Sequence, residues 1–348
     1  MFDFDNLKIN SIRLLLTLFI IFFTLILFGI SPFEVFQSII YGSLGSESKF
    51  IRTLIVWAPI SLASLALIYT FSAGMWNIGI EGQIIMGAVG ATFIARSFLG
   101  DYLISPYIQI LFAVLFGGLW GLLSALLKVK GNVHEIFSGL GLDFVASGIV
   151  IFLIIGPWKR DGIASTGGTD LFHKASWIPT IGNHNFPLML IVIILFLYLL
   201  SYVVLNFTSL GIRLKSTGIN VLATERFYFK SDRYIVFSYL IAGSIAGIAG
   251  FSQASGAYHK LVPSISGGFG FLAILIVLIS SRNIYFSFIL SFLFSILIVG
   301  GSQLQIRLGL DNTIIGIIQA TFVLSWLVLQ RIKVENMILQ KISRVFSK

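Results

Sequence analysis

The most informative group of polar and aromatic side chains lies in residues 72–83, which read Ser-Ala-Gly-Met-Trp-Asn-Ile-Gly-Ile-Glu-Gly-Gln. This block places an indole, two amides and a carboxyl group between two apolar runs: Trp76, Asn77, Gln83 and Glu81. Polar groups in an apolar environment are costly unless they form hydrogen bonds or line a wet path. We therefore predict that these four residues line a polar path, with a polar turn between two helices as the alternative.

Two isolated polar residues in other apolar runs extend this predicted path. Asp143 is the only carboxylate deep in an apolar run, and Gln253 lies near the end of a later one. A single deep carboxylate excludes the aspartate pair of an intramembrane protease. The chain has no cysteine, no Gly-Lys pair for a Walker-type phosphate loop, and four histidines without metal-ligand spacing (134, 173, 184 and 259). These absences predict no catalytic residue, no metal site and no cofactor in this chain.

A basic block, residues 211–227, separates two later apolar runs. Asn220 is placed to act as the N-cap of a short helix, and Leu222 and Phe227 are apolar side chains among charges. A short helix with exposed apolar side chains suits docking into a groove on a soluble partner. A charged segment lying on the membrane surface is the alternative.

Small residues recur every four positions in residues 242–250: Ala242, Ala246 and Gly250, with Gly243 and Gly247 beside them. This small-xxx-small pattern is typical of helices that pack closely in membranes. We predict that these residues pack within the chain. An interface between subunits is the alternative.

Composition indicates where these blocks must sit. Of 348 residues, 57% are hydrophobic and 11% are charged, less than half of the roughly 25% usual in soluble domains. Mean hydropathy is +0.98, which excludes a soluble enzyme and a nucleic-acid-binding domain. We predict an all-α, polytopic transmembrane bundle of about ten helices, over residues 14–30, 51–73, 83–99, 107–127, 136–156, 186–207, 234–256, 269–280, 283–300 and 314–331. The range 269–280 is too short for a hydrocarbon core about 30 Å thick and follows Gly267-Gly268-Phe269-Gly270, so we expect a broken or re-entrant helix there.

Basic residues predict the orientation. With ten crossings and a cytoplasmic N-terminus, 15 of the 23 Lys and Arg residues fall on the inside, where such residues are retained. The C-terminus is then also cytoplasmic, segment 208–233 is internal, and the polar loop 157–185 is external and able to meet an external partner. Neither is large enough for a second domain, so residues 1–348 are predicted to form one transmembrane domain. Glycine-rich stretches near 74–90 and 256–270 suggest corresponding parts of two inverted halves.

At these blocks the chain resembles the permease subunits of ABC importers for nucleosides and simple sugars, in the branched-chain amino acid and ribose-type permease superfamily. The resemblance covers about Phe33 to Asn283. Its most specific element is Asn77-Ile78-Gly79-x-Glu81-Gly82-Gln83, which is similar to the nucleoside-type branch and to the longer of two paired permeases. Asp143 stands where an asparagine is common in the family, and His134 departs from an Asn-Glu-Val pattern.

The resemblance implies a type II importer-like fold and ATP-driven uptake of nucleosides, purine nucleosides foremost, by alternating access across the inner (cytoplasmic) membrane. It implies three protein partners: an ATPase with two nucleotide sites that holds ATP and Mg, a second homologous permease, and an external substrate-binding lipoprotein. The chain itself would then be no enzyme and would bind no nucleic acid. The resemblance implies that the segment from Arg213 to Tyr228 contacts the ATPase, with matching positions at Arg213, Leu214, Gly218, Asn220 and Ala223. To these we add Lys215, Leu222 and Phe227, which lie in the same segment, as candidate contacts. A permease for a sugar such as ribose or galactose, an ion-coupled transporter using Asp143, and a scaffold without transport are the alternatives.

Overall fold

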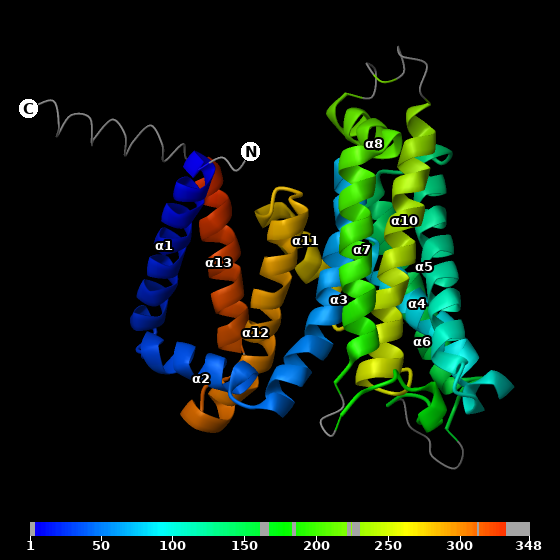
Figure 1. The fold of residues 1–348 in the computed structure, drawn as a ribbon, viewed down its shortest axis with the longest axis horizontal. Helices are drawn as coiled ribbons and strands as arrows, with labels where there is room; N and C mark the ends of the chain where they lie inside the picture. Colours follow the sequence, from blue (N-terminus) through cyan, green and yellow to red (C-terminus); the bar gives the residue numbers. More distant parts are fainter. Residues whose placement is uncertain are drawn as a thin grey trace, which may run out of the picture. The chain divides into compact units, whose positions relative to one another are not determined.

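In the computed structural model, helices account for the regular structure of the described part of the chain (Figure 1). The described residues are 4–160, 167–182, 186–220, 224, 230–311 and 313–331. Within them, strand pairing is limited to an isolated bridge between Ile181 and Phe186. The all-α prediction is therefore confirmed.

Seven helices in the described residues are long and apolar enough to cross a membrane. They are α3 (Glu47–Ser72), α5 (Ser105–Val129), α6 (Glu135–Ile155), α7 (Leu188–Phe207), α10 (Ser231–Phe251), α12 (Ile284–Leu308) and α13 (Thr313–Arg331). A π-helical turn, Ser252–Ala257, continues α10. The pair α1 (Phe4–Leu27) and α2 (Pro32–Leu44), bent by 112°, makes an eighth span if it is taken as one. The chain is thus a multi-pass membrane protein, as predicted.

The two remaining predicted spans are short helices, α4 (Ile80–Ala95) and α11 (Phe269–Ile279). All ten predicted ranges therefore contain a helix. The range 83–99 was placed too late, because the helix ends at Ala95 and a separate 3-10 turn, Phe98–Asp101, follows it. Helix α2 was not predicted, although Pro32 in its first turn is a common helix start.

The chain divides into two compact units, residues 1–50 with 296–348 and residues 51–295. In the first unit, α1 packs along α13 (Figure 1). The Tyr41 ring of α2 lies 3.9 Å from the Lys49 ammonium and 3.9 Å from the Arg307 guanidinium. These cation–π contacts join α2 to the ends of its neighbouring helices.

Helix α4 lies at the centre of the second unit, where nearly every one of its residues is buried. It packs with α5 and α10, and glycines permit this close approach. A Cβ atom at Gly243 would overlap the Gly117 carbonyl oxygen, and one at Gly250 would overlap that of Ile84. The structure places the small-residue set within the chain, on the buried part of α10: Ala242, Gly243, Ala246, Gly247 and Gly250.

Replacing Gly247 by alanine should destabilise the second unit, because the added methyl group would overlap the Ala113 carbonyl oxygen on α5. Overpacking of this kind costs about 1–3 kcal/mol. We expect a lower Tm for the purified importer when its thermal unfolding is measured by intrinsic fluorescence. The control is Gly148→Ala on α6, where an added Cβ meets no atom within 4 Å. Equal Tm values for the two variants would contradict the packing argument.

The second unit has two opposite ends. Helix α8 (Ser209–Ile219) lies at one end of α7 and α10, and residues 167–182 lie at the other (Figure 1). We call these the inner end and the outer end. This separation agrees with the topology drawn from the basic residues, which sets 208–233 inside and 157–185 outside.

Candidate functional site

The first feature of the site is a meeting of two helix N-termini inside the second unit. Glu81, in the first turn of α4, lies beside the start of α11, although 189 residues separate it from Gly270. One oxygen, Glu81 Oε1, accepts the backbone N–H groups of Gly270 at 2.9 Å and of Phe271 at 3.2 Å. Both Glu81 and Gly270 are buried. Helix α11 therefore begins within the protein.

Asp143 accepts a hydrogen bond from the start of α4 in the same way. Its Oδ1 atom accepts the Gly82 N–H at 2.7 Å, and its side chain is buried on α6. The N-terminus of a helix carries unsatisfied N–H groups and a partial positive charge, so a carboxyl oxygen is favourable there. Two of the predicted path residues thus stabilise the starts of the two short helices.

Asn77 and Gln83 form a reciprocal pair of side-chain amides. Asn77 Nδ2 donates to Gln83 Oε1 at 3.2 Å, and Gln83 Nε2 donates to Asn77 Oδ1 at 3.1 Å. Both side chains are buried. This pair fastens the turn after α3 to the first turns of α4, and it leaves neither amide without a partner.

Trp76 lies apart from this buried cluster, toward the inner end. Its side chain is 43% exposed, and its ring packs against Phe71 at a centroid distance of 5.3 Å. A cavity of about 350 Å³ adjoins it, and Arg282 and Leu278 also line that cavity. Of the six predicted path residues, Trp76 is therefore the one that faces this inner cavity.

Gln253 faces a larger cavity at the outer end, of about 660 Å³. It belongs to the π-helical turn that follows α10. The cavity also has four aromatic residues and two cations on its walls: Trp177, Tyr258, His259, Phe269, Arg52 and Lys174. Such a cavity can hold a flat, polar molecule of moderate size.

The aromatic wall of the outer cavity was not predicted. The Trp177 and His259 rings stack at 3.8 Å with an interplanar angle of 11°. Burial lowers the pKa of His259 more than its hydrogen bond to the Ser255 carbonyl raises it, so the imidazole is neutral near pH 7. Trp177 in the polar, glycine-rich loop 157–185 was the available signal for an aromatic wall, but its stacking partner, His259, is distant in the sequence.

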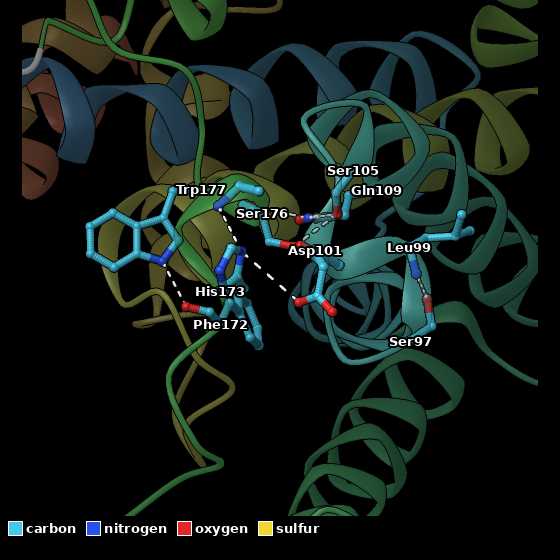
Figure 2. A network of polar contacts seen from close by, with 11 residues as sticks. Ser97, Leu99, Asp101, Ser105, Gln109, Phe172, His173, Ser176 and Trp177 are labelled. Carbon is cyan, nitrogen blue, oxygen red and sulfur yellow. Dashed lines mark hydrogen bonds and ion pairs between the residues drawn. The ribbon is translucent and has the colours of Figure 1, made fainter.

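A buried network fixes this loop to α5 (Figure 2). Gln109 Nε2 donates to Ser105 Oγ at 2.9 Å and to the Ser176 carbonyl at 3.0 Å, while Ser255 Oγ donates to Gln109 Oε1. Ser176 Oγ also bonds the Gly100 carbonyl at 2.8 Å. The four side chains of this network are fully buried, so this part of the external loop is a fixed wall.

Backbone hydrogen bonds hold the same loop against the segment after α10. The Thr169 N–H donates to the Leu261 carbonyl at 2.9 Å, and the Phe172 N–H donates to the His259 carbonyl at 2.8 Å. The Ile178 N–H donates to the Ser255 carbonyl at 3.2 Å. These contacts position Trp177 against His259 and define the mouth of the outer cavity.

At the inner end, α8 occupies the predicted coupling segment. Arg213 Nη1 donates to the Tyr234 hydroxyl at 2.9 Å, and Lys215 Nζ donates to Asn206 Oδ1 at 3.0 Å. Asn220 ends α8 in an extended conformation, and its carbonyl accepts the Thr224 N–H. It is thus the C-cap of α8, and the short helix that we expected it to cap begins outside the described residues. Leu222, Ala223 and Phe227 lie outside the described residues.

Gly218 brings α8 directly against the turn that leads into α4. A Cβ atom at Gly218 would overlap the Ser72 carbonyl oxygen, and Gly74 lies opposite with a φ of 78°. Only glycine adopts this conformation without strain. Backbone contact therefore runs from α8 to the residues that precede Asn77 and Glu81.

Asp143 acts here through an oxygen, and an amide oxygen can replace it. We expect Asp143→Asn to keep uptake within about threefold, because Oδ1 can still accept the Gly82 N–H. Asp143→Leu leaves that buried N–H without its acceptor, at about 1–3 kcal/mol, and should lower both Tm and uptake. Parallel uptake and melting measurements on the two variants check this. Complete loss of uptake in Asp143→Asn would show that the carboxyl proton itself is required.

The family model described as branched-chain amino acid transport system / permease component matches residues 49–324. The chain is 26% identical to the glucose ABC transporter permease protein TsgB13 of Haloferax volcanii, over 86% of this chain and 81% of that one. It is 25% identical to the guanosine ABC transporter permease protein NupP of Bacillus subtilis, over 82% of each chain, and 23% identical to the nucleoside ABC transporter permease protein NupB of Lactococcus lactis, over 85% and 84%. No solved structure matches.

Proposed function

Because the chain belongs to the branched-chain amino acid transport system / permease component family, we propose that it is the membrane-spanning subunit of an ATP-driven importer for nucleosides, purine nucleosides foremost. Transport proceeds by alternating access across the cytoplasmic membrane. The observation that carries the cargo assignment is the outer cavity of about 660 Å³, which combines aromatic rings with the Gln253 amide.

A nucleoside matches the chemistry of this cavity. Stacking of a base on an aromatic side chain contributes about 1–3 kcal/mol, and Trp177 and Phe269 supply such rings. The Gln253 amide has both donors and an acceptor for the edge of a base or for ribose hydroxyls. The relatives NupP and NupB, a guanosine and a nucleoside permease, support the same cargo.

The barrier in this conformation is the buried cluster whose sequence neighbours line the two cavities: Trp76, next to Asn77, lines the inner one, and Phe269, next to Gly270, lines the outer one. It consists of the Asn77–Gln83 amide pair and the Glu81 contact with α11. Passage of a nucleoside from Gln253 toward Trp76 requires the starts of α4 and α11 to separate. The hydrogen bonds that break in that step are those from the Gly270 and Phe271 N–H groups to Glu81. Polar groups of the cargo can replace them.

The energy for transport comes from partner subunits. Concentrating a solute about ten-thousandfold costs about 5.5 kcal/mol, and an ATPase with two nucleotide sites supplies it, holding ATP and Mg itself. Helix α8 is the segment on which the ATPase docks. A second permease chain completes the membrane part, and an external lipoprotein delivers the nucleoside to the outer cavity.

Uptake of radiolabelled guanosine by the complete reconstituted importer tests the proposal. Unlabelled nucleosides in excess should compete, whereas glucose and ribose should not. Trp177→Ala and Gln253→Leu should each lower uptake about tenfold, in line with the loss of about 1–3 kcal/mol of stacking or of a hydrogen bond. Tyr102→Ala, an exposed residue at the same end, serves as the control.

A sugar permease is the second candidate, because the relative TsgB13 is a glucose permease. Competition by glucose or ribose, without competition by nucleosides, would assign the chain to that class. Uptake driven by an imposed ion gradient in ATP-depleted vesicles would overturn both proposals in favour of an ion-coupled transporter.

A further inference from the structure

A pocket at the inner end of the second unit gathers positive charge without a matching carboxylate. It has a volume of about 420 Å³ and lies among α7, α8 and the turn between α11 and α12. Lys215 and Arg282 line it, together with the neutral side chains of Asn206 and Asn283. Among the residues that the structure describes, neither cation has a carboxylate oxygen within 4.0 Å. The pocket therefore favours an anion.

The hydrogen bonds of these two cations leave most of their donors unused. Lys215 Nζ donates to Asn206 Oδ1 at 3.0 Å, and Arg282 Nη1 donates to the Phe71 carbonyl at 3.3 Å. A lysine ammonium has three N–H donors and an arginine guanidinium has five. Both residues are exposed at the pocket, so a ligand oxygen can reach them.

An apolar groove of about 400 Å³ continues from this pocket along α7 and α12. The pocket and the groove share Tyr202, Ile284 and Tyr285. Farther along, Leu199 on α7 is 65% exposed and Ile289 on α12 is 59% exposed, and both line the groove. A small inorganic anion would fill the pocket and leave this groove empty.

We propose that the pocket and the groove together bind one anionic phospholipid of the cytoplasmic leaflet. Its phosphate contacts Arg282 and Lys215, so that Lys215 meets the lipid rather than the ATPase. Its polar head lies beside Asn206 and Asn283, and an acyl chain follows the groove. The inner end faces the cytoplasm in the topology given by the basic residues, and anionic lipids on that side attract Lys and Arg at about 1 kcal/mol each. The bound lipid would fasten α8 to the bilayer on which it moves.

Native mass spectrometry of the complete importer tests this assignment. The importer is titrated with phosphatidylglycerol, with phosphatidylcholine of the same acyl chains, and with glycerol phosphate as the free head group. We expect retention of phosphatidylglycerol alone, and about thirtyfold weaker binding in the double variant Lys215→Gln/Arg282→Gln, as expected from two cations. Lys130→Gln, a cation at the end of α5 outside the pocket, should bind as the unmodified chain does.

The apolar part of the site has its own test. Leu199→Trp should fill the groove and weaken phosphatidylglycerol binding with both cations in place, whereas Leu195→Trp, one turn earlier on α7 and outside the groove, should not. Equal binding of phosphatidylcholine, unchanged binding by the double variant, or displacement of the lipid by glycerol phosphate would overturn the proposal. Cross-linking of the second permease to Leu199 or Ile289 would also overturn it.

Discussion

Substitution of Gly218 by valine is expected to stop uptake almost completely while the importer still binds and hydrolyses ATP. The reason is that a side chain at this position would overlap the Ser72 carbonyl oxygen and push α8 away from the turn before α4. Overpacking in a tight contact costs about 1–3 kcal/mol, enough to favour a displaced α8. Uptake and ATPase activity measured on the same proteoliposomes separate loss of coupling from loss of folding.

The matched control is Gly141→Val, a helical glycine on α6 where an added Cβ meets no atom within 4 Å. It carries the same change in helix propensity without the overlap. If Gly218→Val transports as well as Gly141→Val, the contact between α8 and residues 72–74 does not transmit movement.

Glu81→Leu is expected to have the second large effect, on both stability and transport. The change removes the acceptor of two backbone N–H groups, the buried one of Gly270 and the partly buried one of Phe271. Each buried donor left without a partner costs about 1–3 kcal/mol. We expect a clearly lower Tm and loss of uptake, because α11 is released from α4.

Glu81→Gln separates the hydrogen bonds from the carboxyl group. Its Oε1 atom can still accept from α11, so Tm should fall less than in Glu81→Leu. If the two variants melt at the same temperature, the contact does not hold the two helices together, and the barrier must depend on other groups.

The helices were largely predictable because the signal for a membrane span is local. Each of the ten predicted ranges contains a helix, and the range 269–280 was recognised as too short for a crossing, in agreement with the short helix α11. Helix α2 escaped prediction because its thirteen residues, beginning with Pro32, are too few for a membrane crossing. The end of α4 was misplaced because the apolar run continues into the 3-10 turn at Phe98.

The partners of the site residues were less predictable, because they depend on long-range contacts. Residues 72–83 and Asp143 stood out as costly polar groups in apolar surroundings. The spacing of Asn77 and Gln83 could have suggested their pairing, but nothing near Glu81 in the sequence points to Gly270. The outer cavity is built from a loop and a helix end that are distant in sequence, and only Gln253 among its walls was foreseen.

The carboxyl groups at the starts of α4 and α11 also determine whether a phosphate group can bind at these helix starts. Free helix N-termini attract phosphate groups through their N–H donors. Here the Gly82, Gly270 and Phe271 donors are already taken by Asp143 and Glu81. A phosphate group at this point therefore meets two carboxyl side chains and finds none of these three N–H donors free to bind it.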